Sequence, residues 1–180
     1  MHLPKSITLL HIILPLFFTV QAQNVPVKTG SQFSTADVQQ FLNHHNQARR
    51  ELNISPLQWN ENIAAFAQEW ADYLANKKKC RLIHRYQLKK NEPGYGENIY
   101  WGSSADLFTP LDASISWYGE KDFFKNEPVT IRGISKTGHY TQMIWSSTRE
   151  IGAGKAICPS GGIIIVANYN PAGNIIGSRP

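Results

Sequence analysis

The stretch Ile163-Ile164-Ile165-Val166 limits the possible folds of this chain more than any other segment. Every position in it is apolar, whereas a strand with one face in water alternates apolar and polar residues. The segment 150–158 before it also has strand character, and Pro159-Ser160-Gly161 between the two is a hairpin signal. The sequence therefore predicts a hairpin whose second strand is central in a sheet and covered by helices on both faces.

Two amphipathic segments near the N-terminal half can supply these helices. Ser34 and Asp37 form a pattern typical of a capping box, and residues 38–52 carry apolar side chains at helical spacing, with His45 on the apolar stripe. Asn60 can cap a second helix whose buried stripe runs over residues 63–74. Each helix needs a layer that covers its apolar face.

The remaining segments complete the expected fold. Residues 109–112 read as a helix start that places Trp117 and Glu120 on one face, and residues 94–101 fit a strand or an extended loop. We predict a long loop over residues 121–137 and a short helical turn over residues 138–145. The fold class expected is α+β, a three-layer α-β-α sandwich with a central, mostly antiparallel sheet.

The N-terminus has the layout of a secretory signal peptide. Lys5 precedes an apolar run over residues 9–20, and Val20-Gln21-Ala22 supplies small residues for a cut after Ala22. The alternative is a membrane anchor, but the run is short for roughly 30 Å of hydrocarbon. We expect residues 1–22 to be removed, residues 23–32 to form a flexible lead, and residues 33–180 to form one domain with no transmembrane segment.

The charge of the chain is modest. It carries 18 Lys and Arg against 13 Asp and Glu, a net charge of +5. The dense basic cluster, Lys77-Lys78-Lys79 with Arg81, has no interleaved aromatic residues. The composition does not indicate a nucleic-acid partner, and the cluster is typical of a solvated helix end.

Three short motifs resemble a known family. Gly96-Glu97-Asn98-Ile99, Gly138-His139-Tyr140-Thr141-Gln142 and Asn168-Tyr169-Asn170-Pro171 occur in this order. Together they resemble the signature blocks of the CAP superfamily of cysteine-rich secretory proteins, antigen 5 and pathogenesis-related protein 1, most of all the plant pathogenesis-related protein 1 type. The resemblance runs from about Phe33 to the C-terminus and implies the same α-β-α sandwich.

The resemblance also implies a pocket of two histidines and two glutamates at His45, Glu97, Glu120 and His139. Three interpretations compete for them: a site for zinc or another divalent cation that folding does not require, a metal-dependent hydrolase that activates water, and a hydrogen-bond network that ties helices to the sheet. We lean against an enzyme, because the sequence shows no separate nucleophile or oxyanion feature. His84, after Cys80, is equally compatible with packing and with function.

The two cysteines, Cys80 and Cys158, are an even number in a chain expected to be exported, which favours a disulfide. The alternative is two buried free thiols in a reducing compartment. The resemblance implies that the two pair with each other. Such a bridge would contribute about 4 kcal/mol by the loop-entropy model.

Two further segments carry modification signals. Asn53-Ile54-Ser55 is a glycosylation sequon, which the following Pro56 weakens. The tail after Asn170, residues 171–180, resembles the C-terminal segment that some plant family members release as a signalling peptide, here with a cut before Pro171. The alternative, which we favour, is an ordered C-terminal turn.

The function expected from the resemblance is that of a secreted, extracellular binding protein in defence or host interaction. Sterols or other lipids are the expected ligands, with the segment 121–137 near the site, and an extracellular protein is a further expected partner. The alternatives are the metal-dependent hydrolase and the precursor of a C-terminal peptide.

Overall fold

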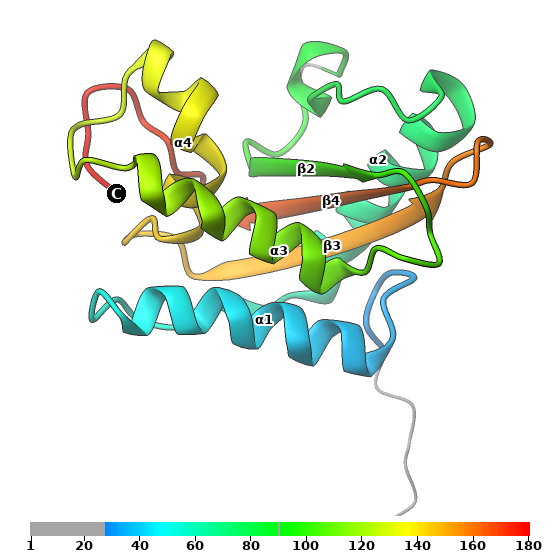
Figure 1. The fold of residues 1–180 in the computed structure, drawn as a ribbon, viewed down its shortest axis with the longest axis horizontal. Coiled ribbons are helices and arrows are strands. Elements are labelled where there is room, and N and C mark those ends of the chain that lie inside the picture. The colour runs from blue at the N-terminus through cyan, green and yellow to red at the C-terminus, as the bar shows by residue number, and fades with distance from the viewer. Residues whose placement is uncertain (1–27, 90) are drawn as a thin grey trace, which may run out of the picture.

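A computed structural model describes residues 28–89 and 91–180, and the predicted signal peptide lies outside these residues. The helices are α1 (Thr35–Arg50), α2 (Glu61–Lys78), α3 (Pro110–Gly119) and α4 (Ile131–Met143), with short 3₁₀ helices η1 (Arg85–Gln87) and η2 (Glu120–Phe123). The strands are β1 (Gln58–Trp59), β2 (Gly96–Gly102), β3 (Glu150–Ile157) and β4 (Ile163–Asn170). Figure 1 shows their arrangement.

The described strands form one sheet in the order β1-β3-β4-β2. β4 pairs antiparallel with β3 and with β2, and β1 alone pairs parallel, with β3. The predicted hairpin and its mostly antiparallel sheet are confirmed. The apolar run of β4 is central, as its lack of alternation required.

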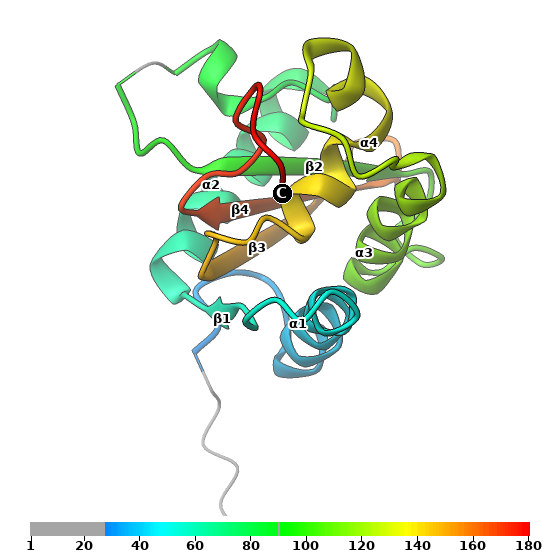
Figure 2. The same ribbon diagram turned by 90° about the vertical axis from the view of Figure 1, so that its left-hand side faces the viewer.

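Helices cover both faces of this sheet, so the three-layer sandwich is confirmed. In Figure 2, α2 lies on one side of the sheet, and α1 and α3 lie on the other. The residues of β4 divide between two cores accordingly. Ile163, Ile165 and Tyr169 pack with Phe41 and other residues on one face, and Ile164 and Val166 pack with residues of α2 on the other.

The helix α2 approaches β3 closely because two glycines leave room for it. A Cβ atom at Gly152 would collide with the backbone of Ala64, and one at Gly154 would collide with the backbone of Gln68. The predicted caps also form. The side chain of Ser34 accepts from the backbone N–H of Asp37 at the start of α1, and Asn60 caps α2 in the same way.

Arg49 joins α1 to the end of α4. Its side chain is fully buried and donates to the carbonyl oxygens of Ser55, Met143, Trp145 and Thr148 at 2.7–3.0 Å. A cation at the C-terminal end of a helix satisfies carbonyls that lack partners within the helix. Burial lowers the pKa of Arg49 to about 10, which still leaves it charged at neutral pH.

Two expectations about the chain are wrong. The predicted loop over residues 121–137 contains η2 and the first turns of α4, which starts at a Thr130 cap whose side chain accepts from Gly133 N–H. The expected flexible lead is wrong for its last residues, because Trp59 Nε1 donates to the carbonyl of Thr29 and Gln32 N–H donates to Gln68 Oε1, both at 2.9 Å. These bonds attach the end of the lead to the domain.

Candidate functional site

His139 and Glu120 form the first polar pair of the candidate site. His139 Nδ1 donates to Glu120 Oε1 at 2.6 Å, and its ring stacks on Trp117 with ring centres 5.9 Å apart. The second carboxylate oxygen accepts from the backbone N–H groups of His139 and Tyr140 at 2.8 and 3.1 Å. Glu120 therefore anchors α4 to η2 with both oxygens, and the His139 side chain remains 38% exposed.

His84 and Glu97 form the second pair. His84 Nδ1 donates to Glu97 Oε1 at 2.8 Å, and the backbone N–H of Arg85 donates to the same oxygen at 3.0 Å. Asn168 Nδ2 approaches the other oxygen at 3.5 Å. The Glu97 side chain is 5% exposed, whereas that of His84 is 35% exposed. This pair fastens η1 to β2, and its residues line a pocket of about 220 Å³ that also includes Tyr95 and Asn174.

The assignment of His45 to the pocket is wrong. His45 is fully buried, its Nδ1 lies 2.9 Å from the carbonyl oxygen of Phe41, and its Nε2 lies 2.9 Å from the Tyr169 hydroxyl. Because a carbonyl only accepts, Nδ1 carries the proton and Nε2 accepts from Tyr169. Desolvation lowers the pKa of His45 to about 3, so the ring is neutral and part of the core.

Tyr169 and Asn98 extend this buried network. The side-chain amide of Asn98 donates to the Tyr169 hydroxyl and to the carbonyl oxygen of His139, each at 3.1 Å. Desolvation raises the pKa of Tyr169 well above its usual value. The network therefore connects α1, β4, β2 and α4 through neutral groups. For His45, this matches the interpretation of a hydrogen-bond network that ties helices to the sheet.

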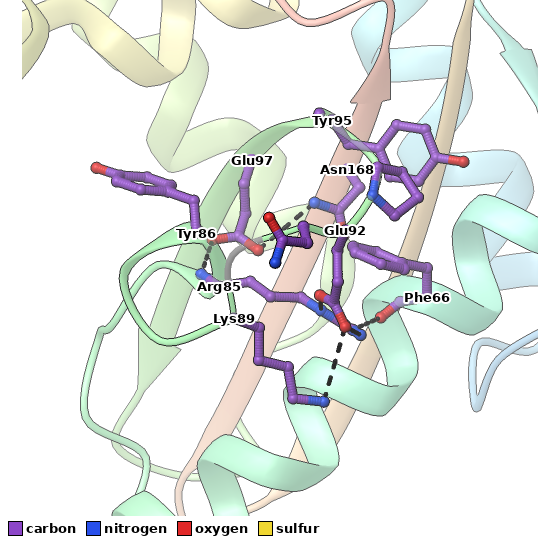
Figure 3. Close-up of a pocket in the computed structure, with 11 residues that line it drawn as sticks. Phe66, Arg85, Tyr86, Lys89, Glu92, Tyr95, Glu97 and Asn168 are labelled. Atoms are coloured by element: carbon purple, nitrogen blue, oxygen red, sulfur yellow. Dashed lines mark hydrogen bonds and ion pairs between the residues drawn. The ribbon is translucent and has the colours of Figure 1, made fainter.

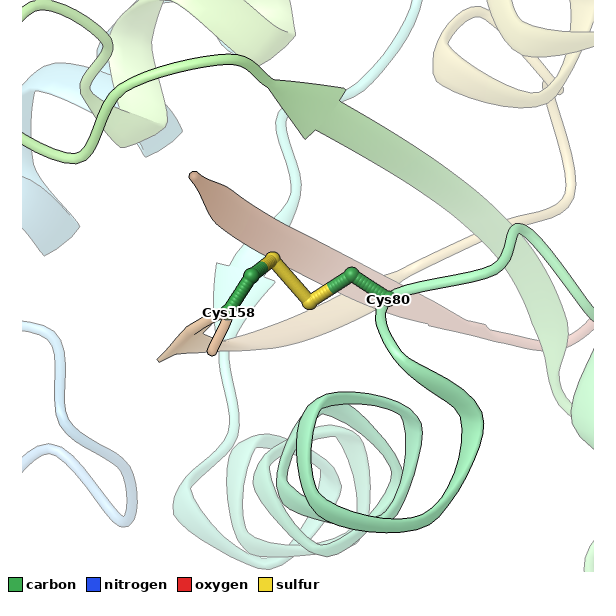
Figure 4. The surroundings of a disulfide bond; sticks show 2 residues. All are labelled: Cys80 and Cys158. Carbon is green, nitrogen blue, oxygen red and sulfur yellow. A yellow bond between two sulfur atoms is a disulfide. The ribbon is translucent and has the colours of Figure 1, made fainter. Parts of the chain in front are cut away.

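Cys80 and Cys158 are bonded in a disulfide, as the resemblance implied (Figure 4). Cys80 follows the end of α2 and Cys158 follows the end of β3, at a sequence separation of 78 and with Cα atoms 5.8 Å apart. The bridge joins the α2 layer to the sheet beside the segment that carries His84.

A second pocket, which we call the apolar pocket, lies at the far end of α4. Its volume is about 450 Å³. The turn after α1, the segment after η2, α4 and the C-terminal residue all contribute to its walls. Its apolar lining residues are Leu52, Ile54, Phe124, Tyr140, Ile144 and Pro180. Lys121 also lines it, and its ammonium group donates to Glu51 Oε2 at 2.7 Å and to the Tyr118 hydroxyl at 2.9 Å.

The C-terminal tail is bound along α4 and the segment before it. Thr148 Oγ1 donates to the carbonyl of Pro171, and the side-chain amide of Asn170 donates to Glu150 Oε2 at 3.0 Å. Further along, Asn174 contacts Gly138 and Thr141, and Gly177 and Ser178 exchange backbone hydrogen bonds with Val129. The segment after Asn170 is an ordered turn in this structure; its processing stays a prediction.

Asn53, the predicted glycosylation site, lies exposed in the turn after α1 with a positive φ of 57°. The side chain of Ser55 in the same sequon is also exposed. Occupancy of the sequon stays a prediction. Across the described residues, no helix combines the length and apolar character that crossing a membrane requires.

Comparison with known proteins identifies the family. A profile of the cysteine-rich secretory protein family, CAP, matches residues 42–169. Pathogenesis-related protein 1C of Nicotiana tabacum is 37% identical over 142 residues, 79% of each chain, and pathogenesis-related protein 1 of Arabidopsis thaliana is 39% identical over 142 residues, 79% of this chain and 81% of the relative. The chain belongs to the CAP family. Within it, the chain is of the plant pathogenesis-related protein 1 type.

Solved structures share the fold. BmVAL-1 superimposes with a TM-score of 0.70 at 24% identity, covering 83% of this chain and 84% of its own. NaASP2, solved with Zn²⁺, superimposes with a TM-score of 0.67 at 26% identity, covering 81% and 85%. These likenesses agree with the sandwich described above.

The structure of NaASP2 with Zn²⁺ raises the question of whether side chains of this protein can hold a metal ion. In residues 28–89 and 91–180, no three His, Cys, Asp or Glu side chains form a group that can hold one ion. His45 is in the core, and His84–Glu97 and His139–Glu120 are separate pairs whose Nδ1 atoms already donate to carboxylates. The four-residue metal site expected at His45, Glu97, Glu120 and His139 does not form in this structure.

His84 is the partner of Glu97. Its sequence context was equally compatible with a packed residue and with a functional one. One signal was available. His84 lies four residues after Cys80, and a bridge from Cys80 to Cys158 brings the segment to the sheet. The pairing with Glu97 still depends on where η1 lies above β2.

Proposed function

We propose that the protein acts outside the cell as a pathogenesis-related 1 type binding protein that takes a sterol or another lipid in the apolar pocket. The observation that carries the proposal is the pocket itself, with about 450 Å³ of space and walls from the turn after α1, the segment after η2, α4 and Pro180. Binding pockets for small molecules typically span about 300–1,000 Å³ and have apolar walls with few polar groups.

The polar groups at the pocket suit a ligand with one hydroxyl. Lys121, Tyr118 and Glu51 form a connected cluster, in which the Tyr118 hydroxyl donates to Glu51 Oε2 at 2.7 Å. Lys121 donates hydrogen bonds to Glu51 and Tyr118, and these bonds raise the pKa of Lys121, so this residue stays a cation. A sterol can place its rings against Leu52, Phe124 and Ile144 and its hydroxyl near this cluster.

An extracellular role in defence agrees with three features. A disulfide persists in oxidising compartments, and Cys80–Cys158 is bonded. The N-terminal residues have the pattern of a signal peptide. Relatives that are 37% and 39% identical to this chain are named as pathogenesis-related proteins. An extracellular protein partner belongs to the same proposal.

The hydrolase alternative receives no support from this geometry. Both oxygens of Glu120 accept hydrogen bonds from protein donors, and Glu97 accepts from His84 and Arg85. A general base needs a free acceptor that points toward the group it deprotonates. Glu120 offers none, and Glu97, whose Oε2 has only the 3.5 Å contact with Asn168 Nδ2, has no group of metal ligands beside it among the described residues.

Sterol binding tests the proposal, with one variant in the pocket and one outside it. Leu52 is 45% exposed and lines the pocket, whereas Leu107 is 74% exposed and does not. We expect Leu52→Asp to weaken binding of a labelled sterol at least about tenfold, because a carboxylate at an apolar wall must lose water when the ligand binds. Leu107→Asp should bind like the parent protein.

The measurement is equilibrium binding of tritiated cholesterol to the purified protein. Circular dichroism of both variants checks that each keeps its fold. Two results would contradict the proposal. One is that the parent protein shows no saturable binding of cholesterol, and the other is that binding falls equally in Leu52→Asp and Leu107→Asp.

A further inference from the structure

A third pocket, which we call the polar pocket, lies on the α2 side of the β2–β4 pair (Figure 3). Its volume is about 230 Å³. The side chains come from α2, η1, the segment after η1, the start of β2 and the C-terminal half of β4. They include Phe66, Arg85, Tyr86, Glu92, Tyr95 and Asn168. The pocket borders the His84–Glu97 pair and shares no residue with the apolar pocket.

Asn168 leaves a buried acceptor without a partner at this pocket. The residue is 1% exposed, and its Nδ2 donates to the carbonyl of Gly96 at 3.2 Å and approaches Glu97 Oε2 at 3.5 Å. Both partners only accept, so the amide orientation is fixed and cannot be reversed. Its Oδ1 accepts no hydrogen bond from any described residue.

An unpaired buried carbonyl oxygen destabilises a fold unless something donates to it. The neighbouring acceptor, Glu97 Oε2, has only the long 3.5 Å contact with Asn168 Nδ2. Two acceptors of this kind beside one pocket call for a ligand that brings hydrogen-bond donors.

The charges at the pocket indicate a ligand without net charge. Two cations, Arg85 and Lys89, and two carboxylates, Glu92 and Glu97, line it. Arg85 is already bonded to both Glu92 and Glu69 and to the carbonyl of Phe66, and Lys89 donates to Glu69 at 2.8 Å. An anion would find both cations engaged, and a cation would lie beside two positive groups.

Aromatic side chains supply the apolar part of the lining. Tyr95 packs edge-on against Phe66 with ring centres 5.1 Å apart, and Tyr86 at the rim is 67% exposed and stacks on His84. Aromatic surface combined with amide and carboxylate acceptors matches a ring that carries C–H groups on its faces and hydroxyls on its edge. Such a ring is a sugar.

We propose that the polar pocket binds one neutral sugar unit, whose hydroxyls donate to Asn168 Oδ1 and Glu97 Oε2 while its ring lies against Tyr86 and Tyr95. Glycans of the extracellular space are the ligand class that presents such units. The proposal is independent of lipid binding, because it concerns different residues on the other face of the sheet.

The test is a titration followed by ¹⁵N–¹H correlation spectra of the purified protein. The probes are methyl β-glucopyranoside, methyl β-galactopyranoside and methyl β-xylopyranoside, with n-butylammonium chloride and sodium phosphate as charged comparators. We expect at least one glycoside to shift the signals of Gly94, Tyr95 and the Asn168 side-chain amide in a saturable way. A dissociation constant on the order of 1 mM suits a ligand of this size.

Two exposed aromatic residues give a matched pair of variants. Tyr86 and Phe123 are 67% and 68% exposed, and only Tyr86 lines the polar pocket. Tyr86→Ala should weaken glycoside binding at least about fivefold, and Phe123→Ala should leave it unchanged. Asn168→Leu, which removes the unpaired acceptor, should abolish the shifts in a protein whose remaining spectrum shows a native fold.

Three results would overturn the proposal. One is the absence of saturable shifts with all three glycosides. Another is tighter binding of either charged comparator, which would mean that the pocket selects charge. The third is equal affinity in Tyr86→Ala and the parent protein, which would place the sugar elsewhere.

Discussion

His45 shows how a single residue is assigned to the core and not to a site. Its apolar neighbours on α1 turn it toward Phe41 and Trp117, whose rings lie 4.4 and 6.2 Å from its own. There the Tyr169 hydroxyl and the Phe41 carbonyl satisfy both ring nitrogens. A buried imidazole with two neutral partners is stable only without a proton.

This burial predicts a specific loss of stability on mild acidification. The unfolded chain protonates His45 near its ordinary pKa of about 6.5, whereas the folded protein resists protonation down to a pKa of about 3. The unfolded state therefore binds more protons as pH falls from 7, and stability falls. We expect His45 to account for about 2 kcal/mol of lost unfolding free energy between pH 7 and pH 5.

Urea denaturation at both pH values measures this loss, and His45→Gln should have a pH dependence smaller by the same amount. His44→Gln serves as the comparison, because desolvation also lowers the pKa of His44. Carboxyl groups with lowered pKa, such as Glu69, lose their contribution only below about pH 4.5. Identical pH profiles for His45→Gln and the parent protein would refute the assignment.

At the scale of elements, the C-terminal tail organises the segment before α4. Its backbone bonds to Val129, and Arg179 donates to the carbonyl of Asn126. Its end, Pro180, forms part of the apolar pocket wall. The tail therefore connects the conformation of this segment to the ligand that we propose for the pocket.

Deletion of residues 171–180 should thus have two effects. Loss of the hydrogen bonds to Val129, Gly138 and Gln142 should lower the unfolding free energy by about 3 kcal/mol. The same deletion should weaken sterol binding, because one wall of the pocket is gone. Thermal denaturation and sterol binding of the truncated chain measure both. A truncated chain with unchanged stability and affinity would show that the tail is an independent appendage, as a peptide precursor requires.

At the scale of the whole molecule, two cores on opposite faces of one sheet hold the sandwich together. The disulfide lies in the core that α2 covers, together with Trp70 and Leu74. It closes the loop between two cysteines at a sequence separation of 78, and this loop includes η1, β2, α3 and α4. Both histidine–glutamate pairs are formed by residues of this closed loop.

Removal of the bridge should therefore destabilise the fold as a whole. We expect Cys80→Ala/Cys158→Ala to lose about 4 kcal/mol of unfolding free energy, the loop-entropy value for a loop of this length. Guanidinium denaturation of the double variant and the parent protein measures the difference. A loss below about 1 kcal/mol would mean that the unfolded chain is already restricted without the bridge.

Much of the fold was predictable from local sequence patterns. The lack of alternation in residues 163–166 required a central strand with two covered faces, and the caps at Ser34, Asn60 and Thr109 marked where three helices begin. The start of α4 was missed because Ile131 and Ile134 are the only apolar residues of 131–137, and both lie exposed instead of on a buried stripe. Its stability comes from Glu120 and the tail, which are distant in sequence.

The sequence by itself determined most of the strands and helices, the layers and the bonded cysteines, because these depend on spacing along one segment or on the resemblance of ordered motifs. Only the tertiary structure decided that Glu97 meets His84 and that His45 meets Tyr169. Such partners lie on different elements, and their distance depends on how side-chain packing fixes η1 and α1 against the sheet. Patterns along the chain record which residues are polar, whereas packing decides which of them meet.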